Sequence, residues 1–238
     1  MNYSKEKLGE NFYITVSDDH KFGTDAFLLS DFSNVRRKDI ACDFCTGCGI
    51  VALLWYRDEN HPKKCYCIDI QDKAIDQLNQ TISENNLSEK VFPILGDLKE
   101  IKKLVGSETL DLVTCNPPYK KADTGILSEL TSEQIARHEI LCTINDVCKS
   151  AYEVLKFGGR LCICQRPERL ADVLEAMRKN KIEPKRLRFV HKNAESAPWL
   201  FLVEGKKGAM PYLQIEKPLI MQGENGYSQE VLKIYKKI

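Results

Sequence analysis

The tetrapeptide Asn116-Pro117-Pro118-Tyr119 combines residue types that could hold an amine in place for a reaction. Its two prolines remove two backbone donors and fix two φ angles, and the residues before them are kept out of the helical region. We therefore expect a rigid, extended corner. Asn116 offers a side-chain acceptor, the carbonyl of Pro117 offers a second one, and the ring of Tyr119 offers a face for stacking. Such a corner suits an exocyclic amine such as adenine N6; the alternative is an ordinary turn after a strand.

Small and acidic residues upstream of this corner form a second set that could bind a ligand. Asp43, Gly47 and Gly49 follow one strand-like run, where glycines let a ligand approach the backbone and the start of a helix. Asp69 ends a second run and is placed to accept hydrogen bonds from ribose hydroxyls. Asp97 follows a third run and is placed to accept from an adenine amino group. Taken singly, Asp69 and Asp97 could instead cap helices or sit in turns.

Apolar runs that alternate with amphipathic stretches predict the elements that must position these residues. Strands are expected at residues 40–44, 65–70, 91–95, 110–115 and 160–165. Helices are expected from residue 50 to 55 and at residues 72–86, 98–104, 143–155 and 167–180, with Gly158-Gly159 ending the fourth. Strands that alternate with helices imply parallel βαβ units in a doubly wound α/β sheet, whose ligands bind beyond the carboxyl ends of the strands.

The two ends of the chain depart from this alternation. Two further strands, with no helix between them, are expected at residues 187–190 and 199–203. They predict an antiparallel hairpin at the edge of a mostly parallel, seven-stranded sheet. Residues 1–39 are expected to form a lead or flap that packs on the core, with a strand at 12–16 and a helix capped by Thr24. We expect a single domain, of which residues 40–238 form the main part.

Two cofactors compete for this arrangement. Residues 47–52 match the Gly-x-Gly-x-x-Gly/Ala fingerprint of dinucleotide-binding proteins, and Asp69 lies about 20 residues further on, as that fingerprint requires. An NAD-binding oxidoreductase would leave Asp97 and the Asn-Pro-Pro-Tyr corner without a role, and the chain offers no obvious partner for hydride transfer. S-adenosylmethionine would use the ends of all four strands. The sequence therefore favours methyl transfer.

The composition is that of an ordinary soluble protein, with 43% hydrophobic and 29% charged residues among 238. No apolar run approaches the roughly 20 residues that a transmembrane helix needs, and the polar N-terminus has no signal-peptide core after it. We therefore expect a cytoplasmic protein. The net charge of +1 gives no overall indication of a partner, so any surface for nucleic acid must come from local clustering.

Ten cysteines are present, and most lie inside strand-like runs, where a free cysteine behaves as a small hydrophobic residue. The spacing Cys45-x-x-Cys48 suits zinc or redox chemistry, but no second Cys-x-x-Cys or His-x-x-x-His accompanies it. A cytosolic protein keeps such thiols reduced. We expect neither a bound metal nor a required disulfide.

At these residues the chain resembles the class I methyltransferases that act on exocyclic amino groups and, more narrowly, the bacterial tRNA(Val) adenine-N6-methyltransferase family. The resemblance runs from about residue 20 to residue 220 and implies a Rossmann-like fold, S-adenosyl-L-methionine as cofactor, and methylation of N6 of the purine 3′ of the anticodon. It rests on Phe22-Gly23-Thr24-Asp25-Ala26, the Gly47/Gly49 loop, the Asn-Pro-Pro-Tyr corner, Ala136-Arg137-His138-Glu139 and residues 202–208.

The resemblance also implies roles for particular residues. Asn116 and the carbonyl of Pro117 would hold N6 while Tyr119 stacks on the flipped-out base. The methyl group would then pass in line from the sulfonium, with no general base or metal needed before transfer. Arg137 and His138, with Glu139, would line the substrate entrance. The residues implied to bind the cofactor are Thr24, Asp25, Asp43, Gly47, Gly49, Asp69, Ile70, Asp97 and Asn116.

The first loop departs from the family pattern at Cys45, where related families often have glycine. A positive φ angle would strain a cysteine at this position. We expect Cys45 to keep a negative φ angle, while Gly47 and Gly49 make the tight turns.

Basic residues gather at residues 178–192, where Lys185, Arg186 and Arg188 are candidates for contacts with RNA phosphates. The alternative is a solvated helix end and loop. We expect tRNA as the partner and a monomeric chain with no membrane attachment. Other acceptors stay open, namely a release-factor glutamine and ribosomal or other nucleic acid, although the typical extra substrate domains have little room here. A scaffold without activity is the remaining class.

Overall fold

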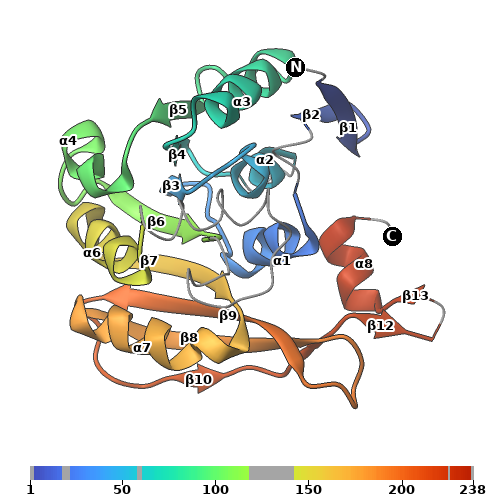
Figure 1. The fold of residues 1–238 in the computed structure, drawn as a ribbon, viewed down its shortest axis with the longest axis vertical. Coiled ribbons are helices and arrows are strands. Elements are labelled where there is room, and N and C mark those ends of the chain that lie inside the picture. Colours follow the sequence, from blue (N-terminus) through green and yellow to red (C-terminus); the bar gives the residue numbers. More distant parts are fainter. Residues whose placement is uncertain (1–2, 18–21, 58–60, 118–141, 225, 237–238) are drawn as a thin grey trace, which may run out of the picture.

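A computed structural model describes residues 3–17, 22–57, 61–117, 142–224 and 226–236. A twisted sheet runs through the molecule, with helices on both faces (Figure 1). Its seven long strands lie in the order β8-β9-β7-β6-β3-β4-β5, and all are parallel except β9, which is antiparallel to both neighbours. These strands are β3 (Ile40–Phe44), β4 (Lys64–Asp69), β5 (Val91–Leu95), β6 (Leu110–Cys115), β7 (Leu155–Gln165), β8 (Ile182–His191) and β9 (Pro198–Lys207).

The predicted seven-stranded, doubly wound sheet with its antiparallel hairpin is confirmed, and two short strands extend it. β10 (Gln214–Ile215) and β11 (Leu219–Ile220) each pair in parallel with β8 at the edge. Within the sheet the strand order reverses at β3, which lies between β4 and β6. Phe44 is level with Ile68 on one side and with Cys115 on the other. The loop after β3 and the corner after β6 are therefore neighbours at the switch point, where ligands bind in such sheets.

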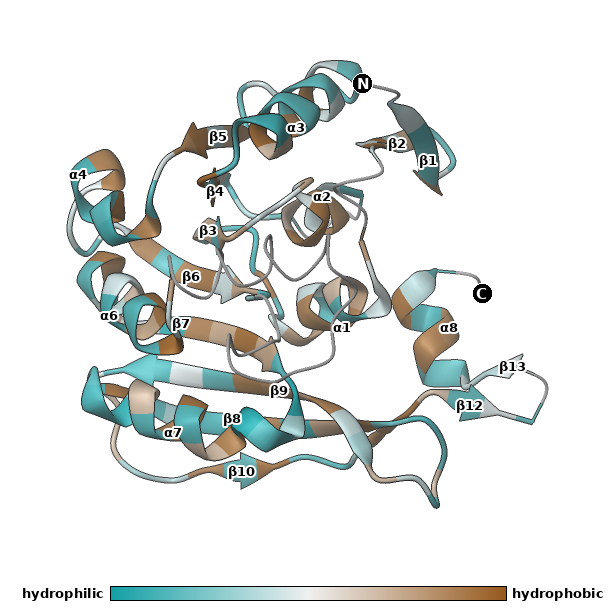
Figure 2. Ribbon diagram, viewed as in Figure 1, coloured by the Kyte–Doolittle hydropathy of each residue, from teal (hydrophilic) through white to brown (hydrophobic). Residues whose placement is uncertain are grey.

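Side chains alternate between the two faces of the sheet along each strand, and helices cover both faces, so both faces are buried. On β7, Cys162 and Cys164 belong to one hydrophobic cluster, whereas Leu161 and Ile163 belong to the other. Figure 2 shows hydrophobic residues along β7 and both kinds of residue on the covering helices. The first cluster includes α1 (Thr24–Phe32), α2 (Ile50–Arg57), α3 (Asp72–Glu84) and α8 (Gln229–Tyr235). The second includes the 3-10 turn η1 (Leu98–Glu100), α4 (Ile101–Val105), α6 (Ile144–Val154) and α7 (Leu170–Lys179), which follows the 3-10 turn η2 (Pro167–Arg169).

The N-terminal segment contains one more strand than expected. β1 (Ser4–Gly9) and the predicted strand β2 (Phe12–Val16) form an antiparallel hairpin that lies on α3. Gln77 Nε2 donates to the carbonyl of Thr15 over 2.7 Å, and the Thr15 amide donates to Thr81 Oγ1 over 2.9 Å. A second small hairpin, β12 (Gln222–Gly223) with β13 (Gly226–Tyr227), precedes α8. Within the described residues, no helix is long and apolar enough to span a membrane.

Two local predictions were wrong. Gly23, not Thr24, precedes the first turn of α1, and no side chain caps this helix; the Thr24 hydroxyl instead lies 2.8 Å from the hydroxyl of Tyr235. Gly158-Gly159 does not end a helix, because α6 stops at Val154 and both glycines lie inside β7. The β6–β7 register shifts near them, so Gly158, with a φ angle of 77°, makes a bulge rather than a helix stop.

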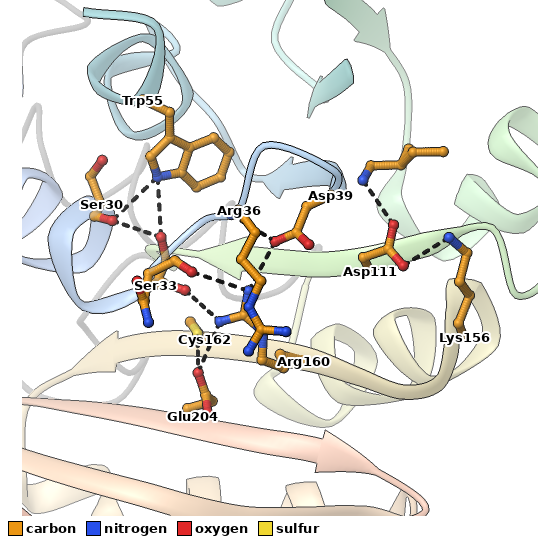
Figure 3. A network of polar contacts seen from close by, with 12 residues as sticks. Ser30, Ser33, Arg36, Asp39, Trp55, Asp111, Lys156, Arg160, Cys162 and Glu204 are labelled. Atoms are coloured by element: carbon orange, nitrogen blue, oxygen red, sulfur yellow. Dashed lines mark hydrogen bonds and ion pairs between the residues drawn. The ribbon is translucent and has the colours of Figure 1, made fainter. Parts of the chain in front are cut away.

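A buried ionic network fastens the end of α1 to the sheet (Figure 3). Arg160 on β7 pairs with Asp39 at 3.0 Å and with Glu204 on β9 at 3.2 Å, and it donates to the carbonyl of Ser33 over 2.6 Å. The indole of Trp55 donates to Ser33 Oγ over 3.1 Å. Every charge in this network has a partner, which buried charges require. The C-terminal end of α1, the helix that begins in the predicted flap, is therefore anchored to the sheet.

Candidate active site

A cavity of about 240 Å³ opens at the carboxyl ends of β3, β4, β5 and β6. It brings together five of the residues predicted to bind a cofactor. These are Gly47, Asp69, Ile70, Asp97 and Asn116, and the rest of the lining consists of Cys45, Ile68, Gln71, Gly96, Leu98 and Cys142. The side chain of Ile70 is 44% exposed and provides an apolar wall. Polar groups converging on a partly apolar cleft are typical of a small-molecule site.

A second chamber of about 210 Å³ lies between the start of α1 and the start of α2. Its lining includes the predicted residues Asp25 and Asp43, and it shares Cys45, Gly47 and Asn116 with the first cavity. The two chambers therefore meet at the glycine loop and the reaction corner. An elongated ligand could extend from one into the other.

The glycine loop contains three residues with positive φ angles. Gly47 has a φ of 53° and Gly49 a φ of 82°, as expected, but Cys45 has a φ of 53°, so the prediction of a negative angle for it was wrong. The physical reason is the anchoring of the next residue, because the Thr46 amide donates to the carbonyl of Ile68 over 3.1 Å. Cys45 must turn sharply to bring that amide back to β4, and it carries the strain of the left-handed region.

The two glycines serve different purposes. A Cβ atom on Gly49 would lie 2.4 Å from Leu78 Cδ1, so this position needs glycine for packing against α3. A Cβ atom on Gly47 would meet nothing within 4 Å, because this residue faces the open cavity. Gly47 therefore allows a ligand to approach the backbone closely.

Asp69 links the glycine loop to the second strand. Its Oδ2 accepts from the Gly47 amide over 2.8 Å, and its Oδ1 accepts from the Gln71 amide over 3.0 Å. Oδ1 also lies 3.5 Å from Gln71 Nε2, so Oδ2 is the oxygen that can still accept from a hydroxyl of a ligand. Asp69 lines the first cavity, and its predicted contact with a ribose stays a prediction.

Asp97 caps a helix, which is one of the two roles that the sequence left open for it; the contact with an adenine amino group stays a prediction. It caps η1, since its Oδ1 accepts from the Lys99 amide over 2.9 Å, and its Oδ2 lies 3.2 Å from Lys99 Nζ. It also lines the first cavity. A helix cap and a position suited to a ligand amine are therefore compatible at this residue.

Asp43 is almost fully buried, although it belongs to the lining of the second chamber. Its carboxylate is buried, and its two oxygens accept from the hydroxyls of Thr114 and Thr46, each over 2.6 Å. Burial raises the pKa of Asp43 to about 7, although the two hydroxyl groups act in the opposite direction. The geometry makes Asp43 a brace between β6 and the glycine loop.

Asn116 occupies the end of β6 with both ends of its amide engaged. Its Nδ2 donates to Asp25 Oδ2 over 3.1 Å, and its Oδ1 accepts from the thiol of Cys164 over 3.0 Å. Pro117 is buried beside it. Pro118, Tyr119, Arg137, His138 and Glu139 lie outside the described residues, so their predicted roles stay predictions.

The cysteines are mainly core residues, as predicted. Only Cys45 and Cys142 are half-buried, and both line the first cavity. Hydrogen bonding with Cys45 and burial raise the pKa of the Cys142 thiol, so it is protonated at neutral pH. Among the described residues, no group of three His, Cys, Asp or Glu side chains could hold a metal. That the protein binds no metal stays a prediction.

The basic residues predicted to contact RNA lie on β8, three strands from β6, and are not part of the cavity. Arg186 pairs with Glu216 at 2.7 Å and with Glu204 at 3.2 Å, and Arg188 pairs with Glu230 at 2.7 Å. Lys185 donates to the carbonyl of Met210 over 3.1 Å. Carboxylates already pair with both guanidinium groups, so these two arginines are less suited to binding a phosphate.

The sequence reasoning missed a cationic and aromatic pair at the carboxyl edge. Arg166 follows β7 directly and is exposed; its guanidinium lies 5.7 Å from the ring centroid of Trp199 and donates to the Trp199 carbonyl over 3.1 Å. Arg166 is two residues beyond Cys164, which contacts Asn116. A basic residue immediately after a strand in a sheet of this kind was the signal available in the sequence.

The parallel sheet with one inserted antiparallel strand, and the glycine loop and Asn116-Pro117 at its switch point, define a class I methyltransferase fold. The chain belongs to the methyltransferase small domain family, whose model matches residues 17–182. This match favours the methyltransferase interpretation of the glycine loop over the dinucleotide one.

Curated relatives support the narrower resemblance. The chain is 24% identical over 143 residues to the tRNA1(Val) (adenine(37)-N6)-methyltransferase of Histophilus somni, a match covering 59% of this chain and 58% of that protein. It is 23% identical over 186 residues to the protein of the same name from Parabacteroides distasonis, covering 77% of this chain and 76% of that one. The predicted likeness to this family is confirmed. The first match nevertheless spans little more than half of the relative's length.

Solved structures share the fold. A predicted O-methyltransferase from Agrobacterium tumefaciens superposes with a TM-score of 0.70 at 17% identity, covering 89% of this chain and 95% of that one. TYW2 from M. jannaschii, solved in complex with AdoMet, has a TM-score of 0.58 at 16% identity and covers 86% of this chain and 85% of its own. At these identities the likeness concerns the fold alone.

Proposed function

We propose that this protein transfers a methyl group from S-adenosyl-L-methionine to the exocyclic N6 of an adenosine in tRNA, the purine 3′ of the anticodon in a valine tRNA. The observation that carries this proposal is the position of Asn116, which is held at the point where the two chambers beside the glycine loop meet. The family match and the names of the curated relatives support the reaction and the substrate.

The residues of the cavity fit the cofactor. Gly47 leaves its side open to a ligand, and Asp69 Oδ2, which accepts one hydrogen bond from the Gly47 amide, would accept another from a ribose hydroxyl. Ile70 would lie against the adenine, and Asp97 would accept from its amino group. Of the other predicted cofactor contacts, Gly49 and Asp43 shape and brace the loop from behind, and Thr24 contacts Tyr235. When bound, the cofactor supplies a methyl group on a sulfonium, a strong electrophile.

The reaction corner would orient the acceptor amine. Asn116 Oδ1 accepts from Cys164, and we assign it a hydrogen bond from an N–H of the target amine as well. The Pro117 carbonyl would accept the other N–H, and Tyr119 would stack on the base. Holding the amine lone pair toward the methyl group is a positioning effect, which can supply a large part of the rate enhancement. No side chain need remove a proton first, because the amine can lose it after transfer.

The RNA surface that the geometry favours lies at the carboxyl end of β7, next to the start of β9. Arg166 and Trp199 offer a cation and an aromatic face beside the reaction corner, a combination that suits phosphates and unstacked bases. Arg137 and His138 would contribute at the substrate entrance. Lys185, Arg186 and Arg188 would contribute less, because the two arginines are already paired.

The test is methylation of bulk tRNA from a strain that lacks the modification, using methyl-labelled S-adenosylmethionine followed by nucleoside analysis. We expect label in N6-methyladenosine, and none with the Asn116→Ala protein. Label in a glutamine of an added release factor, with none in tRNA, would replace this proposal by the protein-methylating alternative. Binding of NAD in place of S-adenosylmethionine would refute both.

A further inference from the structure

The amide of Asn116 lies between a group that can only accept and a group that donates. Asp25 on α1 accepts from Nδ2 over 3.1 Å, and the Cys164 thiol on β7 donates to Oδ1 over 3.0 Å. An ionised carboxylate has no proton to donate, so it can pair only with the NH2 end of the amide. The two ends of an asparagine amide have nearly the same shape, and here Asp25 distinguishes them. The Cys164 thiol can donate or accept, so once Asp25 has fixed the NH2 end, the thiol donates to the oxygen.

Both partners are themselves held in place. Asp25 Oδ1 accepts from the Ala26 amide over 3.0 Å, and a Cβ atom on Gly23 would lie 2.6 Å from that oxygen, so Gly23 leaves the room that the carboxylate needs. Cys164 has no exposed surface and lies in the middle of the sheet. At the other end of α1, Arg160 donates to the Ser33 carbonyl over 2.6 Å. The amide is thus fixed between a held helix and a buried strand.

We propose that Asp25 and Cys164 are positioning residues that fix the direction of the Asn116 amide, with its oxygen on the β7 side. This inference rests on the proposed function, because it assumes that Asn116 Oδ1 accepts a hydrogen bond from the target amine. An amide turned by 180° would point its own N–H groups at the amine and repel it. Asp25 therefore acts through Asn116 rather than on the cofactor, which differs from the role that the sequence implied for it.

The two partners lie on opposite sides of the amide. Asp25 on α1 occupies the side of Nδ2, and Cys164 on β7 occupies the side of Oδ1. The exposed residue Arg166 follows β7 there, beside Trp199. The adenine would enter between this pair and Asn116.

The first arm of the test uses Asp25→Asn, which keeps the shape but removes the acceptor-only character. We expect kcat for tRNA methylation to fall about 10- to 100-fold, the cost of losing a charge-assisted hydrogen bond and its direction. The Kd for S-adenosylmethionine, measured by calorimetry, should stay within about two-fold of wild type. Asp31→Asn is the matched control, since Asp31 is exposed on the same helix and lines a different cavity.

The second arm compares three cysteine variants. Cys164→Ser keeps a donor and should retain most of kcat, whereas Cys164→Ala removes the donor and should lower kcat roughly 3- to 10-fold. Cys162→Ala is the control for the loss of packing, because Cys162 is buried on the same face of the same strand. It should lower the melting temperature about as much as Cys164→Ala without the loss of kcat.

The outcomes separate this proposal from the proposed function. An Asp25→Asn protein with normal kcat and weakened cofactor binding would make Asp25 a cofactor ligand and overturn the inference. Equal losses of kcat in Cys164→Ser and Cys164→Ala would overturn the role of the thiol donor. A wild-type protein that binds S-adenosylmethionine but methylates no tRNA would refute the proposed function itself. If Cys164→Ala fails to fold, the Asp25→Asn and Cys164→Ser measurements still decide whether these residues position the Asn116 amide.

Discussion

The cofactor side of the cavity and the reaction corner present similar polar groups but are constructed differently. On the cofactor side, carboxylates at strand ends accept from backbone amides of the adjacent loop, as Asp69 does from Gly47, 22 residues away. At the reaction corner, side chain contacts side chain, and Asn116 is joined to Asp25 and Cys164 across 91 and 48 residues. Backbone amides are fixed by the fold, whereas side-chain partners can be exchanged one at a time. The corner should therefore be the more sensitive of the two to single substitutions.

The largest effect should come from Asn116→Ala. Removing the acceptor for the target amine should lower kcat by about 1,000-fold or more while the Kd for S-adenosylmethionine stays near wild type, because the loss is confined to the transition state. Single-turnover methylation and calorimetry would separate the two quantities. Asn193→Ala, in the exposed turn between β8 and β9, is a suitable control. A large loss of cofactor affinity in Asn116→Ala would mean that the two sides of the site are not separable.

Asp43 connects the glycine loop on the cofactor side to β6, which carries the reaction corner. Its contribution to the stability of the fold should depend on pH. Its folded pKa is about 7, raised by burial from an ordinary 3.8, so its contribution to stability is complete below about pH 4 and is lost as the pH rises through 7. Asp43→Asn removes this titration. Relative to the variant, the wild-type protein should lose a few kcal/mol of unfolding free energy between about pH 4 and 8, since each pKa unit corresponds to about 1.4 kcal/mol. Urea denaturation of both proteins at several pH values would measure this loss. If the difference in unfolding free energy between them does not change with pH, Asp43 does not have a raised pKa.

Asp69→Ala should weaken the cofactor side alone. The loss of a buried acceptor should cost about 1–3 kcal/mol of S-adenosylmethionine binding, measured by calorimetry. Turnover at saturating cofactor should change much less than in Asn116→Ala. The control is Asp72→Ala, which removes a nearby exposed carboxylate from the first turn of α3. Unchanged affinity in Asp69→Ala would show that this carboxylate only supports the loop.

The smallest effect should come from the RNA surface. Arg166→Glu should raise the KM for tRNA several-fold and reduce the salt dependence of binding by roughly 0.7–0.9 in log–log slope for each phosphate that the protein no longer neutralises. Cofactor binding should not change. Lys149→Glu, at an exposed position on α6 outside the basic stretch 178–192, is the control. Arg186→Glu should instead lower the melting temperature, because it would face Glu204 and Glu216; normal stability with weak tRNA binding would restore β8 as the RNA surface.

The sequence alone determined the order of the elements and the strand ends that carry the site. Periodicity of apolar residues placed β3, β5 and β6 at their observed bounds, because a buried parallel strand reads as a short apolar run. The rule that ligands bind at the switch point then brought Gly47, Asp69, Asp97 and Asn116 together before any contact was known. These inferences succeeded because they depend on local patterns and on a topology shared by many sheets.

Only the tertiary structure decided what each side chain does there. The positive φ of Cys45 follows from the hydrogen bond between Thr46 and Ile68, and the neutralised charge of Arg186 follows from carboxylates 18 and 30 residues away. The direction of the Asn116 amide depends on a helix before the glycine loop and a strand after the corner. Spacing along the chain carries no information on such pairings, because they form only when the faces of distant elements pack in register.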